Sequence, residues 1–127
     1  MQVERIGNIN VATYDGPVLA SERDAIDVIG DTYGQEVDMV VFPAETLTDD
    51  FFWLSSGLAG AVLQKFQNYR LRVAIVGDVA RFTAESSSLR DFIRESNLRG
   101  QMVFVPDRAA LEALLRVQVQ PPTLIID

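Results

Sequence analysis

The stretch that decides the fold, residues 37–78, reads VDMVVFPAETLTDDFFWLSSGLAGAVLQKFQNYRLRVAIVGD. Two apolar runs, Val37–Phe42 and Leu71–Gly77, flank a segment with helical spacing from about Asp50 to Tyr69. A nearly continuous apolar run is typical of a strand that is covered on both faces. A strand, a helical crossover and a second strand are the pattern of a parallel β-α-β unit. We therefore expect two neighbouring strands that run in the same direction, with the helix packed on them.

The expected helix between these strands carries apolar residues at intervals of three or four, which places them on one face. Gly57 and Gly60 interrupt it, each at a cost of about 1 kcal/mol relative to alanine. We interpret the two glycines as places where the helix backbone lies close against the sheet. The apolar row consists of Leu54, Leu58, Val62, Phe66 and Tyr69.

The residues before this unit predict a hairpin and a helix. Val3–Ile6 and Ile9–Tyr14 are rich in strand-forming residues, and Gly7-Asn8 between them suits a tight turn. Ser21 and Asp24 have the spacing of a capping box, which predicts a helix start at this point.

The residues after the unit predict two more helices and a strand. Ser88 and Asp91 have capping-box spacing, and Asp107 is placed to cap a last helix. Met102–Val105 is predicted to be a strand that Pro106 stops. Thr123–Ile126 is a candidate for one more short strand, outside the predicted order. The predicted order is β-β-α-β-α-β-α-β-α in one α/β domain over residues 1–127, with a mixed, mainly parallel sheet flanked by helices.

Composition favours some classes of function over others. The chain has 127 residues, 48% of them hydrophobic, and a net charge of −7 from 11 basic and 18 acidic residues. An acidic chain is poorly suited to nucleic acid or to an anionic membrane surface. The absence of cysteine and histidine excludes disulfides, Zn–Cys/His sites and imidazole-based catalysis. Without a signal-peptide pattern or an apolar span of about 20 residues, we expect a cytoplasmic protein that needs no cofactor.

Several short runs resemble a bacterial family known as domain of unknown function 4180. The resemblance extends over roughly Ser21 to Leu115, and it implies an α/β fold without naming an activity. The runs that carry it are Gly57-Leu58-Ala59-Gly60, Leu63-Gln64-Lys65-Phe66, Asn68-Tyr69-Arg70, Ala74-Ile75-Val76-Gly77-Asp78, Ser88-Leu89-Arg90-Asp91-Phe92-Ile93, Glu95-Ser96-Asn97 and Phe104-Val105.

The order of elements also resembles STAS domains, the anti-sigma-factor antagonists. In those regulators a serine or threonine at the start of the helix after a central strand is phosphorylated, often within Asp-Ser-Ser-Gly-Leu. Leu54-Ser55-Ser56-Gly57-Leu58 stands in the comparable place, with Leu54 where those domains tend to have aspartate. The resemblance implies Ser55 or Ser56 as a phospho-acceptor, whose added charge would change partner affinity. The alternative is that both serines are small polar residues in the first turns of the helix.

Acidic residues gather where the predicted parallel strands end. Ligands of open α/β sheets bind outside the carboxyl ends of the strands, and carboxylates there hold a divalent cation or act as an acid–base pair. The alternative is that each carboxylate caps its own helix. The residues of this predicted cleft are Glu45, Asp49, Asp50, Asp78 and Asp107, with Ser88 at a helix start.

Two further groups are candidates for a partner surface. Polar residues near the ends of two helices form either a docking surface or structural caps and ion pairs: Lys65, Asn68, Tyr69, Arg70, Arg90 and Glu95. Phe51, Phe52 and Trp53 are consecutive, and successive helical residues are about 100° apart, so at least one of them leaves the core face. Trp53 then marks an interface or packs under the neighbouring loop.

These observations favour a non-enzymatic regulatory module that binds a protein partner or forms a homodimer. The alternative is a small enzyme, or a domain that binds a ligand, Mg²⁺ or Ca²⁺ through the carboxylates at the strand ends.

Overall fold

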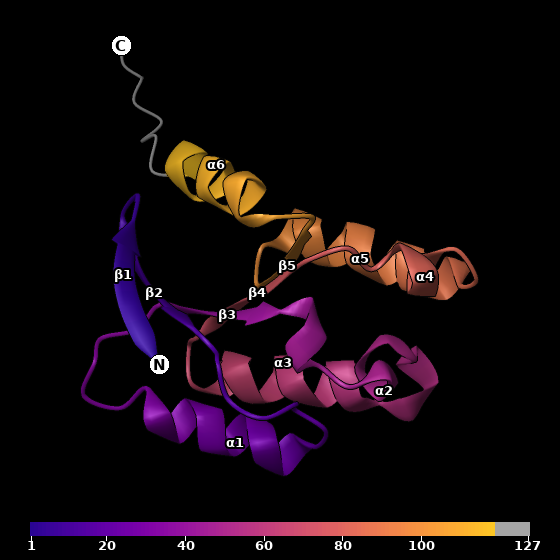
Figure 1. Ribbon diagram of the computed structural model, residues 1–127, viewed down its shortest axis with the longest axis horizontal. Helices are drawn as coiled ribbons and strands as arrows, with labels where there is room; N and C mark the ends of the chain where they lie inside the picture. The colour runs from indigo at the N-terminus through magenta and orange to yellow at the C-terminus, as the bar shows by residue number, and fades with distance from the viewer. Residues whose placement is uncertain (119–127) are drawn as a thin grey trace.

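The computed structural model describes residues 1–118 and shows a five-stranded sheet in the order β1-β2-β3-β4-β5 (Figure 1). β1 and β2 are antiparallel, and the other neighbours are parallel. This is the mixed, mainly parallel sheet that the sequence predicts. The strands are β1 Gln2–Ile6, β2 Ile9–Thr13, β3 Met39–Pro43, β4 Arg72–Val76 and β5 Met102–Val105. The helices are α1 Glu22–Asp31, η1 Ala44–Thr46, α2 Asp49–Phe52, η2 Leu54–Ser56, α3 Leu58–Asn68, α4 Ala80–Thr83, α5 Ser87–Arg99 and α6 Arg108–Gln118.

The β3-α3-β4 unit forms the centre of the molecule. β3 and β4 pair in parallel over their whole length, from Met39 opposite Arg72 to Pro43 opposite Val76. Val40 and Phe42 on β3 and Phe66 on α3 are no more than 1% exposed and belong to one core cluster. The predicted parallel pair with a helix packed on it is therefore confirmed.

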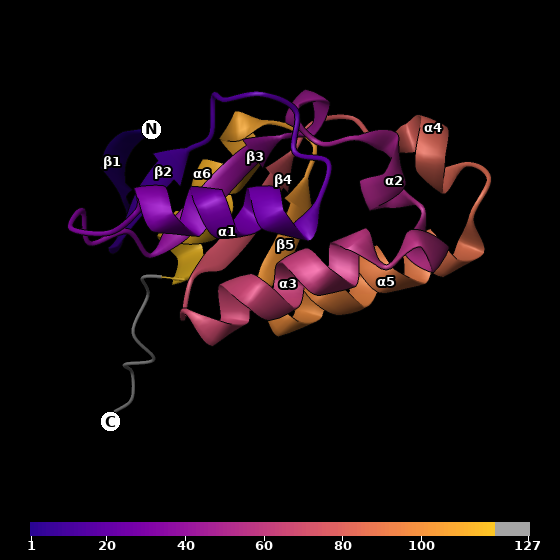
Figure 2. The ribbon, with the colours of Figure 1, turned by 90° about the horizontal axis from the view of Figure 1, so that it is seen from below.

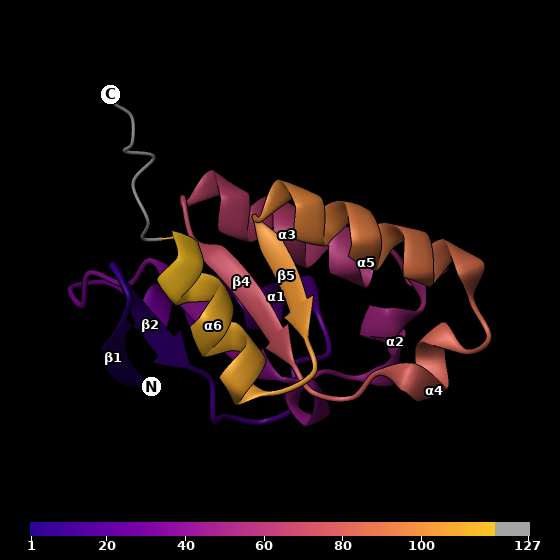
Figure 3. The ribbon, with the colours of Figure 1, turned by 90° about the horizontal axis from the view of Figure 1, so that it is seen from above.

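Helices cover both faces of the sheet, which explains why its central strands are apolar on both sides. α1 and α3 lie on one face, and α6 crosses the other (Figures 2 and 3). Alternate residues of one strand point to opposite faces, so Val40 faces the first core while Met39 and Val41 join Leu111 and Leu115 of α6 in the second. In residues 1–118 no helix combines the length and apolar character needed to cross a bilayer.

Local signals place most of the boundaries correctly. Ile6 pairs with Ile9 across the Gly7-Asn8 turn, where Gly7 has φ +61°. The Ser21–Asp24 capping box is present, and Asp107 Oδ1 accepts a hydrogen bond from the Ala110 N–H at 2.8 Å. The predicted strand Thr123–Ile126 lies outside the described residues.

The predicted continuous helix from Asp50 to Tyr69 is wrong. The chain forms α2, η2 and α3 instead. Trp53 is extended between α2 and η2, and Gly57 adopts φ +80° in the left-handed region between η2 and α3. The proposed close contact of the glycines with the sheet is also wrong, since a Cβ at Gly57 or Gly60 would meet nothing within 4 Å. Tyr69 is 49% exposed, so it does not continue the buried row.

The predicted start of α5 at Ser88 is wrong by two residues. Ser86 is the N-cap, and its Oγ accepts from the Leu89 N–H at 3.0 Å. Asp91, which was expected to complete a capping box with Ser88, instead pairs with Arg94 at 3.0 Å. Ser86, Ser87 and Ser88 are all of a residue type that caps helices, and Leu89, which is 1% exposed, lies in the first turn of the helix that Ser86 caps.

Candidate functional site

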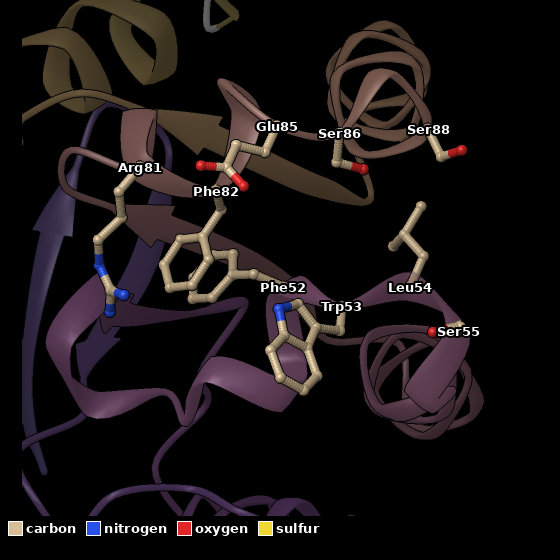
Figure 4. A pocket seen from close by; sticks show the side chains of 9 residues that line it. All are labelled: Phe52, Trp53, Leu54, Ser55, Arg81, Phe82, Glu85, Ser86 and Ser88. Atoms are coloured by element: carbon tan, nitrogen blue, oxygen red, sulfur yellow. The ribbon is translucent and has the colours of Figure 1, made fainter.

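A hollow of about 400 Å³ lies between the connection from β3 to α3 and the connection from β4 to α5 (Figure 4). β3 and β4 are adjacent parallel strands, so both connections leave the carboxyl edge of the sheet. The hollow therefore lies at the edge where α/β proteins bind ligands. Its lining consists of Phe52, Trp53, Leu54, Ser55, Arg81, Phe82, Glu85, Ser86 and Ser88.

Aromatic side chains form one wall of this hollow. Phe51 and Phe52 are 1% and 3% exposed, whereas Trp53 is 60% exposed. Phe52 stacks on Phe82 with ring centroids 4.4 Å apart and planes 12° apart. The short α2 therefore anchors two of its aromatics in the core and leaves the next residue, Trp53, at the surface beside the hollow.

Two charged residues line the hollow, and they differ in their partners. Arg81 Nη2 lies 2.8 Å from Asp49 Oδ1, and its guanidinium carbon lies 4.0 Å from the centroid of the Phe82 ring. Glu85 makes no ion pair with any residue in 1–118. Its carboxylate is thus the charge in the lining that no ion pair within the described part of the chain neutralises.

The two candidate phospho-acceptors have different surroundings. Ser56 Oγ donates to the Asp50 carbonyl at 2.6 Å and accepts from the Leu58 N–H at 3.2 Å, so it stabilises the start of α3. Ser55 is exposed and lines the hollow. Both serines precede α3 instead of lying within a helix that begins at Asp50.

The carboxylates at the strand ends are spread over separate local roles. Asp78 Oδ1 accepts from the Ala80 N–H at 2.8 Å, and Asp107 Oδ1 accepts from the Ala110 N–H in the first turn of α6 at 2.8 Å. Asp49 pairs with Arg81, while Glu45 and Asp50 are exposed. Within residues 1–118 no group of three or more acidic residues is placed to hold a metal ion. Of the predicted cleft residues, Ser88 lines the hollow.

The predicted polar surface set is also dispersed. Lys65 Nζ lies 3.4 Å from Glu22 and connects α3 to α1. Asn68 accepts from Gln64 at 3.0 Å within α3, and the next residues, Tyr69 and Arg70, follow the helix end, with φ +60° at Arg70.

The other two members of this set lie on α5. Arg90 donates to the Thr83 carbonyl and so ties α5 to α4. Glu95 lines a smaller hollow of about 100 Å³ to which α3 and α5 both contribute. The set is therefore divided among helix ends and helix–helix contacts.

Asn97, which lies in one of the runs that resemble the family, has a structural role at the edge of the sheet. Its amide oxygen accepts a hydrogen bond from the Phe104 N–H at 2.7 Å, and its amide nitrogen donates one to the Phe104 carbonyl at 3.3 Å. β5 is the last strand of the sheet order, so these bonds satisfy backbone groups at its free edge. No local sequence pattern predicts the hydrogen bonds between Asn97 and Phe104, because they depend on how α5 packs against β5.

A second hollow of about 280 Å³ has a different chemistry. Tyr14 lines it together with Asp15, Asp24, Asp27 and Asp31. Burial raises the pKa of the Tyr14 hydroxyl, and the neighbouring carboxylates raise it further. The hydroxyl donates to the Pro17 carbonyl, so this tyrosine holds the loop between β2 and α1.

Comparison with protein families gives the identification. Residues 6–115 match the family described as a domain of unknown function, DUF4180. The chain belongs to this family. The DUF4180 match spans β2 through β5 and reaches into α6, so it covers both connections that line the hollow of about 400 Å³ beside Trp53, which we call the Trp53 hollow. No curated protein and no solved structure matches the chain.

Proposed function

We propose that this DUF4180 domain is a non-enzymatic, cytoplasmic regulatory module that binds a protein partner over the hollow beside Trp53. The observation that carries the proposal is the 60% exposure of Trp53 next to a hollow of about 400 Å³. Tryptophan is enriched at protein interfaces and dominates their binding energy, because its large ring excludes water from a central pocket.

The chemistry of the lining favours binding over catalysis. The hollow combines three aromatic rings with hydroxyl groups, and one of its two charged residues, Arg81, is already paired with Asp49. Asp78 and Asp107, the carboxylates closest in sequence to the ends of β4 and β5, accept hydrogen bonds from nearby backbone N–H groups. The regulatory part of the proposal follows from the resemblance to STAS domains, with exposed Ser55 as the phospho-acceptor beside the docking surface.

Capture from a lysate of the source cell tests this proposal. Tagged wild-type protein, Trp53→Ala and Tyr33→Ala are compared, since Tyr33 is an exposed aromatic, 69% accessible, on a different part of the surface. We expect a protein that the wild type and Tyr33→Ala retain and Trp53→Ala loses. Equal capture by Trp53→Ala contradicts the proposal.

Sedimentation distinguishes a foreign partner from a second copy of the chain. A wild-type dimer that Trp53→Ala converts to a monomer identifies the partner as another copy and makes the protein a homodimer. A monomer at all concentrations excludes a second copy, so a protein captured through Trp53 is then a different protein.

A second candidate function is a small-ligand domain at the same hollow. Its volume of about 400 Å³ falls within the range of small-molecule pockets, about 300–1,000 Å³. The divalent-metal form of this alternative uses carboxylates outside the lining of the hollow, because it requires Asp49 or Asp50 to act together with Asp78. Thermal unfolding in the presence of millimolar Mg²⁺ or Ca²⁺ tests that form, and an unchanged Tm removes it.

A further inference from the structure

The Trp53 hollow contains one charge that is still available to a partner. Arg81 and Glu85 are the charged residues of its lining. The Arg81 guanidinium is occupied by Asp49 at 2.8 Å and by the face of Phe82, whereas Glu85 makes no ion pair among the described residues. Figure 4 shows Glu85 and Trp53 on opposite sides of the hollow, with the carboxylate on one side and the indole on the other.

An open indole ring and a carboxylate across one hollow form a receptor for a positive charge. The face of tryptophan attracts cations more strongly than that of any other aromatic residue. The hollow already contains an example, because Arg81 lies 4.0 Å from the centroid of the Phe82 ring. The other face of that stack is closed by Phe52, so Trp53 is the aromatic ring that remains accessible.

The positive N-terminal end of α5 lies near the hollow and disfavours a bound cation, but its effect is smaller than the attraction by the Glu85 carboxylate. Ser86 and Ser88 belong to the start of α5, whose dipole is equivalent to about half a positive charge. Glu85 directly precedes this N-cap and carries a full negative charge. At longer range the chain has 18 acidic and 11 basic residues, and its net charge of −7 attracts a basic partner.

We propose that the hollow receives a lysine or arginine side chain of the protein partner, between Trp53 and Glu85. This inference rests on the proposed function and specifies the chemistry of the partner. The occupant is a protein segment instead of a free cation because Leu54 and the largely exposed Trp53 ring extend beside the charge. Covering this apolar surface requires residues on either side of the basic one.

Titration of the tryptophan fluorescence with defined peptides tests the proposal. Trp53 is the chain's single tryptophan, so the emission reports on this hollow alone. The probes are capped Gly-Leu-Arg-Leu-Gly and the same peptide with citrulline or glutamate in the centre, each up to about 10 mM. Citrulline keeps the shape of arginine and removes its charge. We expect the arginine peptide to bind at least about 5-fold more tightly than the citrulline peptide, and the glutamate peptide to bind most weakly.

A matched pair of variants tests whether the preference for arginine over citrulline depends on the Glu85 carboxylate. Glu85→Gln and Glu95→Gln change the net charge equally, and Glu95 lies at a different, smaller hollow. We expect Glu85→Gln to abolish most of the preference for arginine over citrulline and Glu95→Gln to keep it. Equal binding of the arginine and citrulline peptides, tighter binding of the glutamate peptide, or no response to the arginine peptide overturns the inference.

The peptide titration can fail while the proposed docking surface at Trp53 stands, so the two proposals are tested separately. If Trp53→Ala loses the captured protein while wild-type protein does not distinguish arginine from citrulline, the docking surface stands and the basic side chain is wrong. If free arginine amide binds as tightly as the arginine peptide, the occupant is a small cation and the protein segment is wrong.

Discussion

α3 and the segment before it, residues 49–57, were expected to form one helix, and their structures differ. α3 is a regular helix of 11 residues that buries Leu58, Ala59, Val62 and Phe66. The earlier segment consists of two short pieces, α2 and η2, and it exposes Trp53 between them. The regular helix stabilises the core, and the irregular segment presents a side chain to the surface.

The difference shows that an irregular segment can expose a residue, here Trp53, next to buried neighbours. A helix continued from α3 through residues 49–57 would rotate the three consecutive aromatics by about 100° per residue about one axis. The chain instead leaves helical geometry at Trp53, where Phe51 and Phe52 are buried and Trp53 is exposed. The predictions below measure how much stability each of the two regions contributes.

The largest expected effect separates a core aromatic from a surface aromatic. Phe66→Ala removes a ring that is 0% exposed and contacts Phe42, so it should lower the free energy of unfolding by about 3–5 kcal/mol. Trp53→Ala should change it by no more than about 0.5 kcal/mol, because most of the side chain lies in solvent. Denaturant unfolding followed by circular dichroism measures both. Comparable losses in the two variants would show that Trp53 supports the fold.

The two glycines of this region should respond to alanine with opposite signs. Gly57 has φ +80°, where an L residue is strained, so Gly57→Ala should cost about 1–2 kcal/mol. Gly60 lies inside α3 with free space around it, and Gly60→Ala should stabilise the protein by about 0.5–1 kcal/mol. Thermal unfolding of the pair provides the comparison. A stabilising Gly57→Ala would mean that α3 extends backwards through η2.

The neighbouring serines should differ because one stabilises a helix start. Ser56→Ala removes the acceptor of the Leu58 N–H and should cost about 1 kcal/mol. Ser55 is exposed, so Ser55→Ala should remain within about 0.5 kcal/mol of the wild type. The shifts of the urea unfolding midpoint at constant m-value measure the change in unfolding free energy of each variant. A larger loss at Ser55 would reverse the assignment of the capping residue.

The smallest effects concern the ion pairs that tie each region to a neighbour. Lys65 pairs with Glu22 at 3.4 Å, and Arg81 pairs with Asp49 at 2.8 Å, in both cases with partly exposed side chains. Lys65→Gln and Arg81→Gln should each cost about 0.2–1 kcal/mol and less at high salt. Unfolding at low and high ionic strength tests this. A cost that salt leaves unchanged would point to packing of the side-chain stems.

The candidate site was predictable in part. The three consecutive aromatics require that one of them leave the core face, and Trp53 is that residue. Phe82 and Glu85 were not recognised, because they follow β4 and no local pattern relates them to Trp53. The carboxylates at the strand ends were predicted to line a cleft. Asp78 and Asp107 instead accept hydrogen bonds from backbone N–H groups two or three residues away, as their positions before a helix allow.

The sequence by itself determined the order of elements, the parallel β3-β4 pair, the hairpin at Gly7 and the caps at Ser21 and Asp107. These features depend on the periodicity of apolar residues and on hydrogen bonds between near neighbours. The tertiary structure decided the break at Gly57, the choice of Ser86 over Ser88 and the closure of the β5 edge by Asn97. Each of these depends on which distant surfaces pack together, and local patterns leave several nearly equivalent choices for packing to resolve.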